Sequence, residues 1–197
     1  MADDSSSGFR AGRTALVVRI PEADPVTCAW RERFDPSARA GVPAHVTVLF
    51  PFLDESRVDA SVHVALADVL GGHPPFDLRF EKCGRLPGVL YLVPAPDAGL
   101  RRLTEAIAAR WPEAPPYGGR FAEVIPHLTV AQGQEDTVLE GIETDLAGGL
   151  PFTSRVSSVE LLVHDGTRWR ERASFALGAD HRPTDPAAPG TLGGVAP

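Results

Sequence analysis

The sequence predicts one α+β domain, built mainly from antiparallel strands, with a weak internal duplication. Segments with alternating apolar side chains, which indicate strands, are interspersed with segments whose apolar residues recur at helical spacing. Two apolar, β-branched segments repeat one pattern, His-x-Thr-x, beginning at His45 and at His127. The chain has 197 residues, of which 43% are hydrophobic and 23% are charged. This length suits one well-packed core and is too short for two independent ones.

The N-terminal half is predicted to run strand, helix, motif strand, helix and hairpin. Ser56 has the type and position of a helix cap, and the apolar stripe that follows it ends at Gly71-Gly72. Proline and glycine delimit the other elements. The predicted ranges are a strand at 14–20, a helix before Pro36, the first motif strand at 45–52, a helix at 56–70, and a hairpin of 76–80 with 88–93.

The C-terminal half repeats this order as helix, motif strand, helix and hairpin. Asp97 is placed to cap a helix that runs to Trp111, and the following stretch is rich in proline and glycine, as loops are. The predicted ranges are a helix at 97–111, a loop at 112–119, the second motif strand at 125–131, a helix at 138–146, and strands at 152–163 and 169–177 around the turn Asp165-Gly166.

The two ends of the chain differ in composition from this pattern. Residues 179–197 alternate proline with small residues, and residues 1–10 are acidic and serine-rich. Such segments bury too little apolar surface to offset the entropy lost on ordering. We therefore expect disorder in 1–10 and 179–197, and a folded domain at 11–178.

Charge and composition exclude several classes of protein. The net charge of −7 argues against a broad basic surface that grips a long polyanion. No segment has the length of a membrane span, and no basic stretch leads into an apolar one at the N-terminus, so we expect a cytoplasmic protein without membrane contact. Cys28 and Cys83 lack the spacing of a metal or redox site and are expected to be free thiols.

The sequence also argues against ATP-driven ligation and dinucleotide chemistry. Lys82 is the only lysine, and it lies in Glu-Lys-Cys-Gly and not in a lysine–x–Asp–Gly arrangement, so a covalent nucleotidyl-lysine route is disfavoured. The chain has neither a glycine-rich loop ending in Lys-Ser/Thr nor the glycine fingerprint of a dinucleotide site.

The paired motifs carry the predicted chemistry. In an extended strand, alternate side chains share a face, so each motif presents an imidazole and a hydroxyl together while its apolar residues face a core. Two histidines can serve as one general base and one general acid, because the imidazole pKa lies near neutral pH. Threonine hydroxyls suit the non-bridging oxygens of a phosphodiester. The candidate catalytic residues are His45 and His127, and the candidate substrate-binding residues are Thr47 and Thr129.

A single His-x-Thr in a strand is more often structural than catalytic, but two copies in matched contexts favour catalysis or phosphate binding. The remaining histidines lie in less informative places: a predicted helix, a turn before proline, the end of a strand and the tail, at His63, His73, His164 and His181. No ligands stand at zinc-like spacing, so metal-free chemistry is favoured.

The paired motifs resemble those of the two-histidine phosphoesterases, the family of 2′,3′-cyclic phosphodiesterases and 2′-5′ RNA ligases. The resemblance spans about Thr14 to Leu177, and it also rests on the run from His45 to Phe52 and on Tyr117-Gly-Gly-Arg-Phe121. It implies a bilobal, pseudo-two-fold fold with antiparallel sheets, flanking helices and a central cleft lined by both motifs.

The same resemblance implies a metal-independent and cofactor-free enzyme that hydrolyses cyclic phosphates on small nucleotides or RNA ends, and we expect a monomer. His45 would correspond to the proton donor and His127 to the acceptor, with Thr47 and Thr129 on the phosphate. The chain departs from RNA-processing members by continuing its first motif with Leu-Phe-Pro-Phe in place of Arg-Phe-Leu-Gly. Together with the acidic charge, this favours small nucleotides or short ends over long RNA.

Three functions stay open on these residues: cyclic phosphodiesterase, 2′-5′ ligation of RNA ends by the reverse chemistry, and a non-catalytic nucleotide-binding module. The presence of both histidines favours the two enzymes. Several aromatic residues could stack on a base, and two arginines could meet a phosphate, although core packing or solvation is the more frequent role of such residues. They are Phe50, Phe52, Tyr91, Tyr117, Trp169, Arg120 and Arg168.

Overall fold

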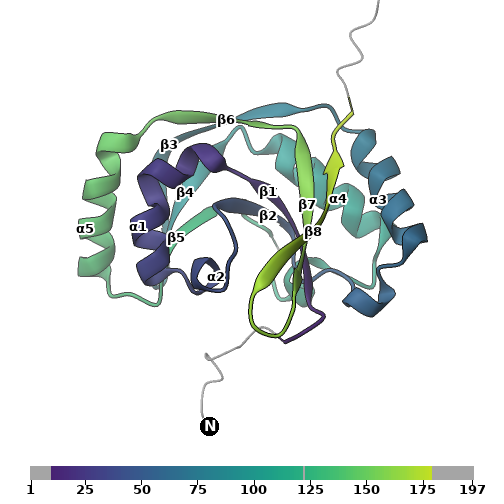
Figure 1. Ribbon diagram of the computed structural model, residues 1–197. Coiled ribbons are helices and arrows are strands. Elements are labelled where there is room, and N and C mark those ends of the chain that lie inside the picture. Colours follow the sequence, from purple (N-terminus) through teal and green to yellow (C-terminus); the bar gives the residue numbers. More distant parts are fainter. Residues whose placement is uncertain (1–9, 122, 179–197) are drawn as a thin grey trace, which may run out of the picture.

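Two four-stranded antiparallel sheets form the body of the molecule, with helices on their outer sides (Figure 1). This computed structural model describes residues 10–121 and 123–178. The segments expected to be disordered, 1–10 and 179–197, lie outside the described residues, apart from Arg10. Within the described ranges, no helix is long and apolar enough to cross a bilayer. The predicted α+β class with antiparallel sheets is confirmed.

Each sheet has a motif strand at its edge. Sheet A has the order β2-β1-β7-β8 and sheet B has the order β5-β4-β3-β6. The strands of sheet A are β1 (Thr14–Arg19), β2 (His45–Leu49), β7 (Ser158–His164) and β8 (Trp169–Ala176). Those of sheet B are β3 (Phe76–Leu86), β4 (Val89–Ala95), β5 (Leu128–Gln132) and β6 (Phe152–Val156). The edge strands β2 and β5 contact each other, which brings the two motifs together from the two sheets.

The helices cross between the halves. Helix α1 leaves β1 of sheet A and packs on β5 of sheet B, whereas α4 leaves β4 of sheet B and packs on β2 of sheet A. Helix α3 covers β8, and α5 covers β4 beside α1. The α-helices are α1 (Asp24–Phe34), α2 (Pro36–Arg39), α3 (Ala60–Gly71), α4 (Ala98–Arg110) and α5 (Asp136–Leu146). Four 3₁₀ turns are η1 (Pro21–Ala23), η2 (Glu55–Arg57), η3 (Pro116–Gly119) and η4 (Ala147–Gly149).

This arrangement relates the halves by a pseudo-two-fold operation. The unit β1–α1–β2 corresponds to β4–α4–β5. Each sheet then continues with two more strands beside this unit: β7 and β8 in sheet A, and β3 and β6 in sheet B. The main core lies between the sheets and the helices, and it draws apolar residues from nearly every element. A smaller cluster lies on the opposite face of sheet A, made by Ala15, Val17, Val42, Leu162 and Trp169.

Four local predictions need correction. The strand expected at 152–163 is two strands: β6 pairs with β3 in sheet B, and β7 pairs with β1 in sheet A, so the chain changes sheet at Ser157. Helix α3 is capped by Asp59, whose carboxylate accepts from two backbone N–H groups, and not by Ser56. Strand β2 ends at Leu49, before the predicted end at Phe52. Strand β5 begins one residue after His127.

Candidate active site

The first motif alternates as predicted. In β2 the side chains of Val46 and Val48 are buried in the main core, whereas His45 and Thr47 are half-buried on the opposite face. The cross-strand partners of these two residues in β1 are Arg19 and Val17. Because paired residues of an antiparallel ladder share a face, His45, Thr47, Arg19 and Val17 lie on one surface of sheet A.

The second motif repeats this alternation in sheet B. Leu128 and Val130 are fully buried, whereas His127 and Thr129 are half-buried. Thr129 pairs with Tyr91 of β4. The predicted site residues are therefore presented from the two contacting edge strands, although His127 stands in the approach to β5 and not within it.

Both histidines are oriented by the same local hydrogen bond. Nδ1 of His45 lies 2.8 Å from the carbonyl oxygen of Pro43, and Nδ1 of His127 lies 2.7 Å from that of Ile125. A carbonyl oxygen only accepts, so Nδ1 must carry the proton in each ring. The neutral tautomer then leaves Nε2 unprotonated. Each imidazole can thus accept a proton at Nε2 or, once charged, donate one there.

His127 is close enough to influence the charge of His45. Burial lowers the pKa of His45 to about 4, against the partial opposition of the Pro43 carbonyl. The positive charges of Arg31 and His127 lower the pKa of His45 further, and the Asp35 carboxylate raises it. His45 is therefore neutral at neutral pH in the ligand-free protein.

An arginine of α1 holds the segment that leads into the first motif. The Arg31 side chain donates from Nη2 to the carbonyl of Val42, three residues before His45, over 3.2 Å. It also forms an ion pair of 3.0 Å with Asp35, one helical turn away. Both side chains are buried, with exposed fractions of 5% and 1%. Asp35 in turn accepts from the backbone N–H of Ser37, which caps α2.

An arginine of α4 holds the segment before the second motif in the same way. Arg101 donates from Nη1 to the carbonyl of Val124, three residues before His127, over 3.3 Å. It also forms an ion pair of 2.7 Å with Asp97, again one turn away, and one of 3.2 Å with Glu123. This second pair is exposed, at 37% for both Arg101 and Asp97.

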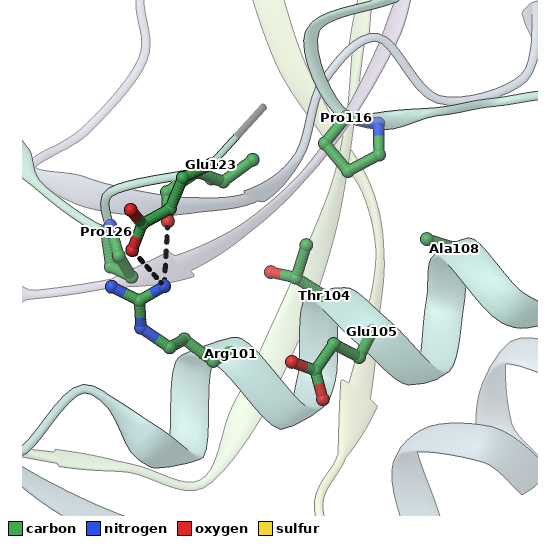
Figure 2. A pocket seen from close by; sticks show the side chains of 8 residues that line it. Arg101, Thr104, Glu105, Ala108, Pro116, Glu123 and Pro126 are labelled. Carbon is green, nitrogen blue, oxygen red and sulfur yellow. Dashed lines mark hydrogen bonds and ion pairs between the residues drawn. The ribbon is translucent and has the colours of Figure 1, made fainter. Parts of the chain in front are cut away.

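A cavity of about 300 Å³ lies between α4 and the segment held by Arg101. Figure 2 shows the Arg101 side chain reaching from the helix to Glu123, with Thr104 and Glu105 along the same helix and Pro116 across from them. Pro126, which precedes His127, also lines the cavity. Thr104 donates to the carbonyl of Val48 over 2.8 Å, so α4 is tied to the first motif strand as well.

Two tyrosines complete the surroundings of the motifs. The hydroxyl of Tyr117 is hydrogen-bonded to Thr47, and burial raises the pKa of Tyr117. Its backbone has a left-handed φ of 51° and donates to the carbonyl of Phe50 over 2.6 Å. The ring of Tyr91 meets His127 edge-on at 5.5 Å between centroids. Phe121, 61% exposed, contacts Tyr117 edge-on.

The other candidate residues separate into core and surface. Phe52 and Trp169 are buried, and Phe50 contacts Trp169 edge-on. Arg120 and Arg168 are exposed. Sequence reasoning missed Arg31 and Arg101, because an arginine in an ordinary helix gives no local signal of a contact with a distant loop. In the described part of the chain, no group of three histidine, cysteine or acidic side chains is arranged to hold a metal ion.

Comparison with known proteins adds a family and a fold. A family model described as the 2′-5′ RNA ligase superfamily matches residues 20–168. E. coli LigT complexed with 3′-AMP has 20% identity and a TM-score of 0.54, over 85% of this chain and 99% of LigT. The protein TT0787 of Thermus thermophilus has 20% identity and a TM-score of 0.57, over 86% of this chain and 100% of that protein. No curated protein matches the sequence significantly.

Proposed function

Because the chain belongs to the 2′-5′ RNA ligase superfamily, we propose that it is a metal-independent phosphoesterase that hydrolyses 2′,3′-cyclic phosphates of nucleotides or RNA ends. One observation carries the proposal. Two His-x-Thr motifs lie on contacting edge strands, and each histidine donates from Nδ1 to the carbonyl two residues before it. This bond occupies Nδ1 in each ring and leaves both Nε2 atoms available for proton transfer.

The proposed reaction uses the pair as base and acid. One imidazole Nε2 takes a proton from water, and the water oxygen attacks phosphorus. The other, as imidazolium, gives its proton to the 2′- or 3′-oxygen that leaves, and one P–O bond of the cyclic ester breaks as the new one forms. Thr47 and Thr129 donate to the non-bridging oxygens, whose charge grows in the transition state.

The ligand-free charge state favours His45 as the base. Its lowered pKa keeps Nε2 unprotonated at neutral pH, and the positive charge of Arg31 contributes to this. His127 then supplies the proton to the leaving oxygen. This assignment is the reverse of the one that the family resemblance implies, and the pH dependence of turnover distinguishes the two.

Ligation is the second candidate, because the family is named for it. It is the same displacement with a ribose hydroxyl in place of water, and it calls on the same four side chains. Which reaction dominates depends on the nucleophile that fills the site. A product analysis separates the two candidates.

The test is to incubate the purified protein with 2′,3′-cyclic nucleotides, with oligoribonucleotides that end in a cyclic phosphate, and with ADP-ribose cyclic phosphate. Nucleotide monoesters are the expected products, and they should be absent with His45→Ala or His127→Ala. Joined oligonucleotides would indicate ligation. Turnover by neither route, with all substrates bound and intact, would make the protein a binding module.

Saturating EDTA should leave the rate unchanged, and a loss that Zn²⁺ or Mg²⁺ restores would contradict the mechanism.

A further inference from the structure

A buried carboxylate lies two strands from the first motif, on the same face of sheet A. The strand register places Thr47 of β2, Val17 of β1, Glu160 of β7 and Ser174 of β8 in one row. Glu160 is only 6% exposed. Two inter-strand steps of about 4.8 Å separate its backbone from that of Thr47, so Glu160 stands roughly 10 Å from the motif.

Only one oxygen of this carboxylate is used. Oε1 accepts hydrogen bonds from the hydroxyls of Ser158, at 2.6 Å, and Ser174, at 3.5 Å. Oε2 is buried and has no hydrogen-bond partner among the described residues. A buried acceptor without a donor destabilises a folded protein, so its retention calls for a reason outside the packing of the sheet.

An exposed ion pair spans β7, the strand that carries Glu160. Arg19 of β1 and Glu171 of β8 meet at 3.4 Å, and both are about half exposed, at 47% and 48%. Strand β7 lies between β1 and β8, so side chains that join these strands must cross it. Arg19 is also the cross-strand partner of His45. Such an exposed pair holds its partners weakly, so a charged ligand can displace it.

The equivalent position in sheet B is closed. There the row runs from Thr129 to Tyr91 and then to Gly84. A Cβ atom at Gly84 would overlap the ring of Tyr91, so the glycine leaves the room that this ring fills. The ring contacts His127 edge-on. In these two described rows, sheet A therefore has a carboxylate at the position where sheet B has a glycine.

We propose that Glu160 forms a base-recognition subsite, in which Oε2 accepts a hydrogen bond from the exocyclic amino group of the substrate's nucleobase. This inference rests on the proposed function. A cyclic phosphate held at the motifs has already used the 2′- and 3′-oxygens of its ribose, so the donors that extend farthest from phosphorus belong to the base. A carboxylate only accepts, and it therefore selects a base with an N–H group. As the ligand enters, the Arg19 side chain leaves Glu171 and turns toward the phosphate beside His45.

The test compares two substrates that differ only in the amino group: 2′,3′-cyclic AMP and the 2′,3′-cyclic phosphate of purine riboside. The wild-type protein should prefer the first by roughly ten- to a hundredfold in kcat/KM, the range for a hydrogen bond to a charged group. Glu160→Leu should remove this preference by slowing the adenosine substrate alone. Glu160→Gln, which keeps the shape and one acceptor oxygen, should fall between them. Glu140→Gln, the same charge change on the far surface of α5, should change neither rate.

Thermal unfolding distinguishes a role of Glu160 in base recognition from a role in stability alone. Glu160→Leu removes the buried Oε2, which has no partner among the described residues, and it also removes Oε1. Ser158 and Ser174, which lose their bonds to Oε1, are partly or fully exposed and can bond to water, so the Tm should stay equal to or above that of the wild type. The proposal is overturned if the variant keeps the preference, if it slows both substrates equally, or if its Tm falls together with both rates. Should the wild-type protein turn over no cyclic phosphate, the proposed function fails. Calorimetry then tests the subsite by itself. The wild-type protein should bind adenosine 3′-phosphate more tightly than purine riboside 3′-phosphate by the same ten- to hundredfold ratio, and Glu160→Leu should bind the two equally.

Discussion

The two halves of the molecule hold their histidines by the same bonds but in different surroundings. In each half an arginine from the preceding helix binds the carbonyl three residues before the histidine and pairs with an aspartate one turn away. Around His45 this pair is buried, and around His127 it is exposed. The repeated local structure makes both imidazoles competent in the same way, and desolvation of the His45 ring keeps that residue neutral.

This difference shows how a duplicated fold can supply two chemical roles from one motif. General acid–base catalysis needs one group charged and the other neutral at the same pH. Two coupled imidazoles that titrate alike hold a single proton between them only over a limited range of pH. Desolvation disfavours the charged imidazole, and it lowers the pKa of His45.

The largest expected effect comes from removing either imidazole. His45→Ala and His127→Ala should each lower kcat by about 10²- to 10⁴-fold, because each removes one proton transfer. The double variant should be little worse than either single one, since the groups act as a unit. Steady-state rates on the preferred cyclic nucleotide measure this. Near-full activity in both single variants would make the symmetric geometry a structural feature only.

The two arginine contacts should differ strongly in their effect on stability. Arg31→Met leaves the buried Asp35 carboxylate without its counter-charge, and we expect a loss of about 3–5 kcal/mol in the free energy of unfolding. Arg101→Met removes exposed pairs and should lose about 1 kcal/mol or less. Urea unfolding measures both. The double variant Arg31→Met/Asp35→Leu should recover most of the lost free energy of unfolding. Equal losses in Arg31→Met and Arg101→Met would contradict the difference between the two halves.

The threonines should affect binding more than turnover. Thr47→Ala and Thr129→Ala each remove one hydroxyl from the phosphate, and we expect losses of roughly 10-fold in kcat/KM, mostly in KM. Thr47→Ser and Thr129→Ser keep the hydroxyl and serve as controls. Because Thr47 is also hydrogen-bonded to Tyr117, the comparison with Tyr117→Phe shows how much of its effect comes through that contact. A serine variant as impaired as its alanine counterpart would point to packing instead.

The smallest effect concerns pH. If His45 is the base, kcat/KM should fall only as pH drops toward about 4, where the neutral form is lost. Removing the Arg31 charge should raise the pKa of His45, so Arg31→Met moves this acid limb to higher pH, and Asp35→Asn moves it to lower pH. Arg101→Met should leave it in place. An acid limb at the ordinary pKa of histidine would return the base role to His127.

Folding should respond to the same titration. The pKa of His45 is lowered on folding, so its neutral form favours the native state above the unfolded pKa of about 6.5. That contribution is lost as pH falls from about 6.5 to about 4. His45→Gln should remove this component from the pH dependence of the free energy of unfolding.

Local sequence determined the parts of this protein that depend on near neighbours. The alternation of Val46 and Val48 with His45 and Thr47 predicted which side chains leave the core, because the period of a strand is two. The helical stripes predicted α1, α3, α4 and α5 in order, whereas the short helix α2 was not predicted. Even the carbonyls that orient the histidines lie only two residues before them. Errors fell at ends of elements, such as the cap at Asp59 in place of Ser56.

Only the tertiary structure decided what depends on register and on contacts between distant elements. The change of sheet at Ser157 depends on which distant strands pair with each segment, β3 with β6 and β1 with β7. The same holds for Glu160, whose place in the row of Thr47 follows from the pairing of three strands. The pKa of His45 depends on how deeply the fold buries it and on Arg31 from another helix. Burial and long-range electrostatics are properties of the whole packed chain, so the first motif by itself did not determine the charge of His45.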